Sequence, residues 1–220
     1  MYITIAGGGL IGRGLSKTLI DNKHDVIIID SSASVCEEIY ARLGAVTING
    51  NATSLETLEN ARIEQSDVAV AVMRDDSDNL NFALLAKHFK VPQIVVRMHN
   101  PKYEDIYKSI GVSNIARATD MLIDQMLVNI ESPDLRKVTG FGNLEICIIN
   151  IGRKSFIGGR SIKEINALKD FPQDIIIAAV FQDETKAFII PRSSTVVKAL
   201  DRLFVCGTHE NIKKASRFLS

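Results

Sequence analysis

The stretch YITIAGGGLIGRG at residues 2–14, followed by VIIID at residues 26–30, decides the fold that this sequence predicts. An apolar, β-rich segment leads into the pattern G-x-G-x-x-G. An amphipathic segment then runs from Leu10 to Asp21, and a second apolar segment ends on Asp30. This order of elements is that of a βαβ unit that binds a dinucleotide.

Each residue type in this stretch has a physical reason. Gly7 lets the chain turn out of the first strand, Gly9 lets a pyrophosphate approach the backbone, and Gly12 lets the helix pack close to the sheet. The free N–H groups at the start of the helix are expected to hold the phosphates. The carboxylate of Asp30 would accept both ribose hydroxyls and repel a 2′-phosphate, which favours NAD or an adenine nucleotide over NADP. The alternative is a glycine-rich turn that binds nothing.

Composition narrows the classes of protein that remain. The 220 residues are enough for two domains, and 46% of them are hydrophobic. The 26 basic and 26 acidic residues give no net charge, which argues against nucleic-acid binding. Cys36, Cys147 and Cys206 lie far apart, as expected of free thiols in a reducing compartment. No apolar segment approaches the roughly 20 residues that cross a bilayer, so we expect a cytoplasmic protein without direct membrane insertion.

The order of predicted elements divides the chain. Through residues 1–130, strands alternate with short helices, which predicts a Rossmann-like, doubly wound parallel sheet. The pattern changes at residues 131–140, which we expect to be a linker. Residues 141–220 contain a predicted hairpin at 174–190 and a closing helix, and are expected to form a small α+β domain.

Other residues have two interpretations each. Asp75, Asp76 and Asp78 could bind a divalent cation, but the spacing favours helix capping and interaction with the helix dipole. The apolar stripe in the helix expected at 119–130 could be ordinary core or a dimer interface. The four histidines are scattered, and no metal-ligand spacing links them.

Motifs along nearly the whole chain resemble one family. The sequence is similar to the cytosolic regulatory subunits of potassium channels and transporters of the TrkA/Ktr type, which consist of an RCK N-domain and an RCK C-domain. The motifs that carry the resemblance are IAGGGLIG at 5–12, IID at 28–30, INGNAT at 48–53, VAVM at 70–73, IVVR at 94–97, IGGRSI at 157–162, IP at 190–191 and LDRLFV at 200–205.

The resemblance implies a subunit of a gating ring, without catalysis, that binds a nucleotide and controls a separate membrane potassium channel or transporter. It implies a homo-oligomer of dimers assembled into a ring, located in the cytoplasm at the inner face of the membrane. By position, the resemblance implies that the glycine turn contacts the phosphates and that the residue at the end of the second strand contacts the ribose. The segment after the third strand would contact the adenine, and the opposite side of the nucleotide site would be lined by the segment after the fourth strand and by an arginine. The implied site residues are Gly7, Gly8, Gly9, Leu10, Ile11, Gly12, Asp30, Ser31, Asn51, Ala52, Thr53, Val72, Met73 and Arg97.

The sequence departs from the family pattern at several positions. The family usually has Asp in place of Asn51, Thr in place of Met73 and Gly in place of Leu200, and its ATP-responsive members carry Arg in place of Leu10. Without that cation, we expect NAD(H) or AMP/ADP as the ligand and consider ATP less suitable. The alternative function is a small NAD-dependent oxidoreductase with residues 141–220 as its substrate domain, although no reacting group stands out.

Overall fold

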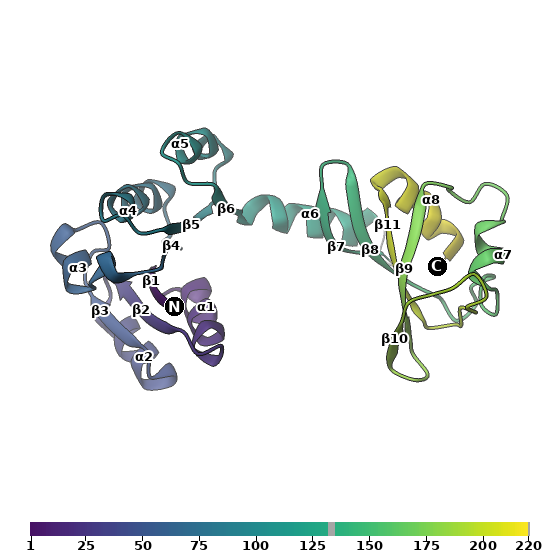
Figure 1. Cartoon of the computed structure of the whole chain (residues 1–220), viewed down its shortest axis with the longest axis horizontal. Helices are drawn as coiled ribbons and strands as arrows, with labels where there is room; N and C mark the ends of the chain where they lie inside the picture. The colour runs from purple at the N-terminus through teal and green to yellow at the C-terminus, as the bar shows by residue number, and fades with distance from the viewer. Residues whose placement is uncertain (132–134, 220) are drawn as a thin grey trace. The chain divides into compact units, whose positions relative to one another are not determined.

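The structure, a computed structural model, describes residues 1–131 and 135–219 (Figure 1). The chain divides into two compact units, Met1–Met121 and Leu122–Ser220. Among the described residues, no helix is both long enough and apolar enough to cross a membrane.

The first unit contains a six-stranded, fully parallel sheet with strand order β3-β2-β1-β4-β5-β6. Because β1 pairs with both β2 and β4, the strand order reverses at β1, and this point is where open α/β sheets bind ligands. The strands are β1 (Tyr2–Ala6), β2 (Asp25–Asp30), β3 (Val46–Asn49), β4 (Val68–Ala71), β5 (Gln93–Met98) and β6 (Asn114–Arg117).

Helices cover both faces of this sheet, so its central strands are buried on both sides. The neighbours Ile28 and Ile29 are both fully buried, Ile28 in the core under α1 and α2 and Ile29 in the core under α3, α4 and α5. The helices are α1 (Leu10–Asp21), α2 (Ala33–Leu43), α3 (Leu55–Asn60), α4 (Asp76–His88) and α5 (Glu104–Ser109), with 3-10 turns η1 (Ile63–Gln65) and η2 (Pro101–Tyr103). Helix α6 (Ala118–Glu131) begins in the first unit and continues into the second. The predicted doubly wound sheet is confirmed.

The second unit contains a five-stranded antiparallel sheet with strand order β10-β9-β11-β8-β7. One face of this sheet packs against α8 and α7 around a core that includes Cys147, Val205 and Ile212. The elements are β7 (Leu135–Phe141), β8 (Leu144–Asn150), α7 (Ile162–Asn166), β9 (Ile175–Gln182), β10 (Ala187–Ile189), β11 (Arg202–Thr208) and α8 (His209–Leu219). This arrangement is the small α+β domain that we expected.

One segment differs from the expectation. We expected residues 131–140 to form a linker, but Leu135–Phe141 is strand β7 and pairs with β8. The pairing register shifts between Lys137 and Thr139, and this irregularity interrupts the alternation of apolar and polar residues by which a strand is predicted. Residues 132–134 of the expected linker lie outside the described part of the chain.

Candidate functional site

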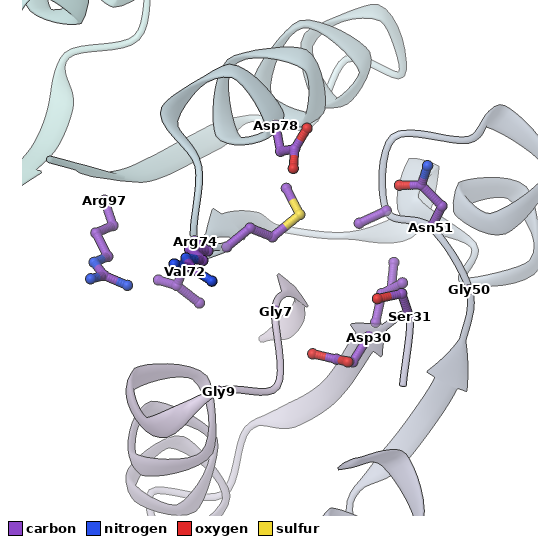
Figure 2. A pocket seen from close by; sticks show the side chains of 13 residues that line it. Gly7, Gly9, Asp30, Ser31, Gly50, Asn51, Val72, Arg74, Asp78 and Arg97 are labelled. Carbon is purple, nitrogen blue, oxygen red and sulfur yellow. The ribbon is translucent and has the colours of Figure 1, made fainter. Parts of the chain in front are cut away.

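A cavity of about 400 Å³ lies in the first unit beside the turn that leaves β1 (Figure 2). Its lining comes mainly from the segments that follow the carboxyl ends of β1, β2, β3, β4 and β5, and it therefore lies at the reversal of strand order. The residues that line it are Gly7, Gly9, Ile29, Asp30, Ser31, Gly50, Asn51, Ala52, Val72, Met73, Arg74, Asp78 and Arg97.

The glycines of the turn have different structural reasons. Gly7 has a φ of +107°, and a Cβ atom there would lie 3.1 Å from the backbone of Val72 and Met73. A Cβ atom on Gly12 would lie 1.9 Å from the carbonyl oxygen of Gly7, so only glycine allows α1 to approach β1 this closely. At Gly9, in contrast, no heavy atom lies within 4 Å of an added Cβ. The fold therefore does not explain glycine at position 9.

Gly9 is the residue that caps the N-terminus of α1. Within residues 1–131 and 135–219, the backbone N–H groups of Gly9, Leu10, Ile11 and Gly12 have no hydrogen-bond acceptor. The first turn of α1 also contains no acidic residue. Unpaired N–H groups at a helix N-terminus form a partial positive charge, which attracts anions.

The carboxylate of Asp30, at the end of β2, is linked to the glycine turn. One of its oxygens accepts a hydrogen bond from the N–H of Gly8 at 2.7 Å, and the other accepts one from the N–H of Ser32 at 2.9 Å. The backbone carbonyl of Asp30 accepts hydrogen bonds from Gly50 N–H and from the amide of Asn49. Asp30 thus joins the turns that follow three neighbouring strands.

The segment after β3 places an amide at the cavity. The side-chain oxygen of Asn51 accepts hydrogen bonds from the N–H and the hydroxyl of Thr53, both at 2.9 Å. These bonds leave the amide NH₂ group of Asn51 as the free donor. Thr53 does not line the cavity and instead orients Asn51.

The segment after β4 is held by buried polar side chains of α4. Asn79, fully buried, accepts a hydrogen bond from Met73 N–H and donates to the carbonyls of Met73 and Arg97. The carboxylate of Asp76 accepts hydrogen bonds from the N–H groups of His99 and Asn100. These contacts fix the turn after β4, which carries Met73, and the end of β5, which carries Arg97.

The three aspartates at the start of α4 therefore have separate positions. Asp75 is the N-cap residue, but its side chain makes no capping hydrogen bond, which corrects the expected capping role at that residue. Asp76 and Asp78 lie in the first turn, where their charge complements the helix dipole, and Asp78 also lines the cavity. In the part of the chain that the structure describes, no group of three or more His, Cys, Asp or Glu side chains is arranged to hold a metal ion.

The two sides of the cavity carry opposite charges. Figure 2 shows Asp30 and Ser31 on one side of Gly7, and Arg74 and Arg97 on the other. The Nε atom of Arg97 is buried and has no hydrogen-bond partner among the described residues. A buried donor without a partner costs free energy, so an acceptor from a ligand would be favourable there.

Two buried groups near the cavity are held in their neutral forms. Burial, together with the charge of Asp30, raises the pKa of the Cys36 thiol above its ordinary value. Burial and the charge of Asp76 raise the pKa of the Tyr107 hydroxyl, which donates a hydrogen bond to the carbonyl of Asp76. Both groups are therefore structural at neutral pH.

The structure brings most of the predicted site residues together at this cavity. Five do not line it: Gly8, Leu10 and Ile11, Gly12, and Thr53. Four lining residues were not predicted, namely Ile29, Gly50, Arg74 and Asp78. Arg74 and Asp78 follow β4, and the adjacency of β4 to β1 in a sheet of this topology is the signal that would have found them.

The sheet order, the glycine turn and the acid at the end of β2 define a Rossmann-type domain with a ligand cavity, followed by a small α+β domain. Residues 3–118 match the TrkA-N domain and residues 149–220 match the TrkA-C domain. The chain therefore belongs to the TrkA family.

Relatives of known sequence agree with this family, and a solved structure has the same fold. A "Trk system potassium uptake protein TrkA homolog" of Methanothermobacter thermautotrophicus is 30% identical over 99% of this chain and 98% of its own length. A protein of the same name from Archaeoglobus fulgidus is 32% identical over 97% of this chain, which spans only 48% of that relative. The solved structure "GsuK channel bound to NAD" has a TM-score of 0.69 and is 19% identical in sequence. The match covers all of this chain and 39% of the GsuK chain.

Proposed function

We propose that this chain is a nucleotide-sensing regulatory subunit of potassium transport, and that its cavity binds NAD(H) or an adenine nucleotide such as AMP or ADP. The observation that carries the proposal is the open space at Gly9 beside unpaired N–H groups, because no protein atom explains either feature. The names of the relatives, which are potassium uptake proteins, support the transport role. The NAD complex of a structure with the same fold supports the class of ligand.

The start of α1 provides the place for the phosphates. The free N–H of Gly9, which lines the cavity, donates to a phosphate oxygen, and the other unpaired N–H groups of the first turn and the dipole of α1 add a favourable field. A side chain at position 9 would project into the space that a phosphate needs, which is why glycine is required there although the fold alone does not require it.

Asp30 provides the place for the ribose. Each carboxylate oxygen accepts one backbone hydrogen bond and has capacity for a second, so both ribose hydroxyls can donate to it. A 2′-phosphate at the same place would be repelled by the carboxylate. The site therefore favours NAD over NADP.

The side of the cavity opposite Asp30 favours some ligands over others according to their charge. Arg74 and Arg97 favour an anionic group on the side away from Asp30. Leu10, where a cation would be needed for a triphosphate, is apolar and 91% exposed. A diphosphate or dinucleotide therefore suits this cavity better than ATP does.

The apolar stripe of α6 supports assembly into a homo-oligomer. Large exposed apolar residues that are close together on one helix indicate a surface that a partner covers, and here the proposed partner is a second copy of the chain. Dimers of this kind would assemble into a ring against a membrane potassium channel or transporter, at the cytoplasmic face. The exposed residues of the stripe are Met121, Leu122, Ile123, Met126, Leu127 and Ile130.

The mechanism that we propose is a shift of population without catalysis. The nucleotide can change the state of a ring only if it binds one arrangement of subunits more tightly than the other. Of the carboxylates that line the cavity, Asp30 accepts backbone hydrogen bonds with both of its oxygens, which suits a role in holding a ligand.

Titration calorimetry on the purified full chain tests the ligand. NAD⁺, NADH, AMP and ADP are titrated separately, with NADP⁺ and ATP as comparison ligands. We expect saturable binding of NAD(H) or of AMP and ADP, and weaker binding of NADP⁺ and ATP. Absence of binding for all six compounds contradicts the proposal.

Turnover and sizing separate this function from an oxidoreductase. We expect no consumption of NADH with a panel of carbonyl substrates, and light scattering should give a mass larger than that of one chain. Turnover that is lost when a residue of the second unit is changed would assign the chain to the oxidoreductases instead.

A further inference from the structure

Gly8 lies in the middle of the glycine turn but does not line the cavity. It is buried, and its N–H donates to Asp30 at 2.7 Å. A Cβ atom on Gly8 would lie 2.7 Å from Val35 and 2.8 Å from Ile39, so the turn packs directly against α2. Gly8 is therefore held by the end of β2 through its N–H and packs against α2 at its Cα.

The carbonyl oxygen of Gly8 is held by a charged side chain. The Nε–H of Arg13, on α1, donates to this oxygen at 2.8 Å. A second nitrogen of the same guanidinium, Nη1, pairs with Glu38 of α2 at 2.6 Å. Arg13 thus connects the glycine turn to α2 through two fixed contacts.

The orientation of the next N–H group follows from this contact. The Gly8 carbonyl and the Gly9 N–H belong to one planar trans peptide, so they point in opposite directions. Because Arg13 holds the carbonyl, the Gly9 N–H is directed away from it, and this N–H has no acceptor within the described ranges. Gly9 itself lines the cavity.

We propose that Arg13, held in place by Glu38, is a positioning residue that orients the Gly8–Gly9 peptide so that the Gly9 N–H faces the phosphate of the ligand. This inference rests on the proposed function, since it needs a ligand that carries phosphate. Arg13 does not contact the ligand in this account. It acts through the backbone of the turn.

The chemistry of arginine suits this role better than that of lysine. A planar guanidinium presents Nε and Nη donors in a fixed geometry, so one side chain can hold a carbonyl and a carboxylate at once. Arg13 and Glu38 are both partly exposed, and a partly exposed ion pair adds little to the stability of a fold. The main effect of removing the pair should therefore be local to the turn.

The test compares a ligand that carries phosphate with one that lacks it. The full chain is titrated with ADP, or with NAD⁺ if that binds more tightly, and with adenosine. Where adenosine binds too weakly for direct titration, its affinity is obtained by competition against the first ligand. The variants are Arg13→Ala, Arg13→Lys and Glu38→Gln, and the matched control is Lys17→Ala, which removes the same charge from an exposed position one turn further along α1.

We expect Arg13→Ala to lower the affinity for the phosphate ligand by about tenfold or more, and the affinity for adenosine by less than twofold. Arg13→Lys should not restore the affinity, Glu38→Gln should give a smaller loss of the same kind, and Lys17→Ala should change neither ligand. If Arg13→Ala lowers the affinities for both ligands equally, or changes neither affinity, the positioning role is overturned. If the unaltered chain binds neither ligand, the proposed function itself fails, which is a separate outcome.

Discussion

The two units of this protein differ in how completely their polar groups are paired within the chain. In the first unit, Gly9 and Arg97 both line the cavity, and neither the exposed N–H of Gly9 nor the buried Nε of Arg97 has an acceptor among the described residues. In the second unit, the carboxylate of Asp201 is only 1% exposed, and its two oxygens accept hydrogen bonds from the N–H groups of Asp183 and Lys198.

This difference indicates where a ligand is needed. Buried polar groups are normally paired, and an unpaired one costs free energy unless something outside the chain completes it. The polar groups around Asp201 are complete without a ligand, so they stabilise the fold of the second unit. The buried Nε of Arg97 lacks a partner, and the unpaired N–H groups at the start of α1 are open to a ligand, so we propose that both serve to bind a nucleotide.

The largest expected effect is that of Gly12→Val in the first unit. The Cβ atom would lie 1.9 Å from the carbonyl oxygen of Gly7, which is backbone and cannot move aside, so we expect a loss of about 3 kcal/mol or more in the free energy of unfolding. Urea unfolding followed by tyrosine fluorescence measures it, because the chain has no tryptophan and all four tyrosines lie within residues 1–121.

Gly14→Val is the matched control for this change. Gly14 lies on the same helix, and nothing lies within 4 Å of an added Cβ there. Equal urea midpoints for the two variants would show that the close approach of α1 to β1 is not what requires glycine.

The next effect is on ligand affinity, through Asp30→Ala. The change removes the proposed acceptor for the ribose hydroxyls and also leaves the Gly8 N–H without its partner, so we expect a loss of about 1–3 kcal/mol in binding free energy. Titration calorimetry measures it, and Asp25→Ala, an exposed aspartate at the other end of β2, is the control. Unchanged affinity in Asp30→Ala removes this residue from the site.

In the second unit, Asp201→Ala should reduce stability without involving the cavity. Two backbone N–H groups lose their acceptor, and we expect the second unit to lose about 1–3 kcal/mol. The readout is urea-dependent labelling of Cys147, a buried thiol whose pKa burial raises to about 12. Mass spectrometry of the labelled peptides separates Cys147 from Cys36, which reports on the first unit and should not change.

The smallest effect is a gain in stability from Leu200→Gly. Leu200 has a φ of +70°, which is unfavourable for a residue with a side chain, and it is 43% exposed, so little packing is lost. We expect a stabilisation of up to about 1 kcal/mol by the same labelling of Cys147, because the greater freedom of glycine in the unfolded chain offsets part of the relief. Leu144→Gly, at a comparably exposed strand position, should instead destabilise, and a loss of similar size in both variants would contradict the strain at Leu200.

The parts of the fold that are encoded locally could be predicted from the sequence. The first strand, the glycine turn, α1 and Asp30 follow one another in the chain, and their spacing alone placed them correctly. Strand β7 was not predicted, because the shift in its pairing register interrupts the alternation that identifies a strand. A local sequence pattern cannot predict a shift of pairing register, because the shift depends on a strand elsewhere in the chain.

In the candidate site, too, residues whose role depends on local sequence could be predicted, and residues whose role depends on distant contacts could not. Asp76 was expected to serve its own helix, whereas its carboxylate binds the turn after β5, which is more than 20 residues away. Arg74 and Asp78 enter the cavity only because β4 pairs with β1. Residues that act through such distant contacts become visible once the order of strands in the sheet is known.

Calorimetry on Gly9→Val, compared with the unaltered chain, tests the central claim most directly. We predict that the unaltered chain binds NAD(H) or an adenine nucleotide and that the variant gives no measurable heat of binding. The circular dichroism spectrum and the urea midpoint of the variant should match those of the unaltered chain, because the added side chain meets no protein atom within 4 Å of its Cβ. A variant that binds as tightly as the unaltered chain would contradict the claim that the space at Gly9 is kept open for a phosphate.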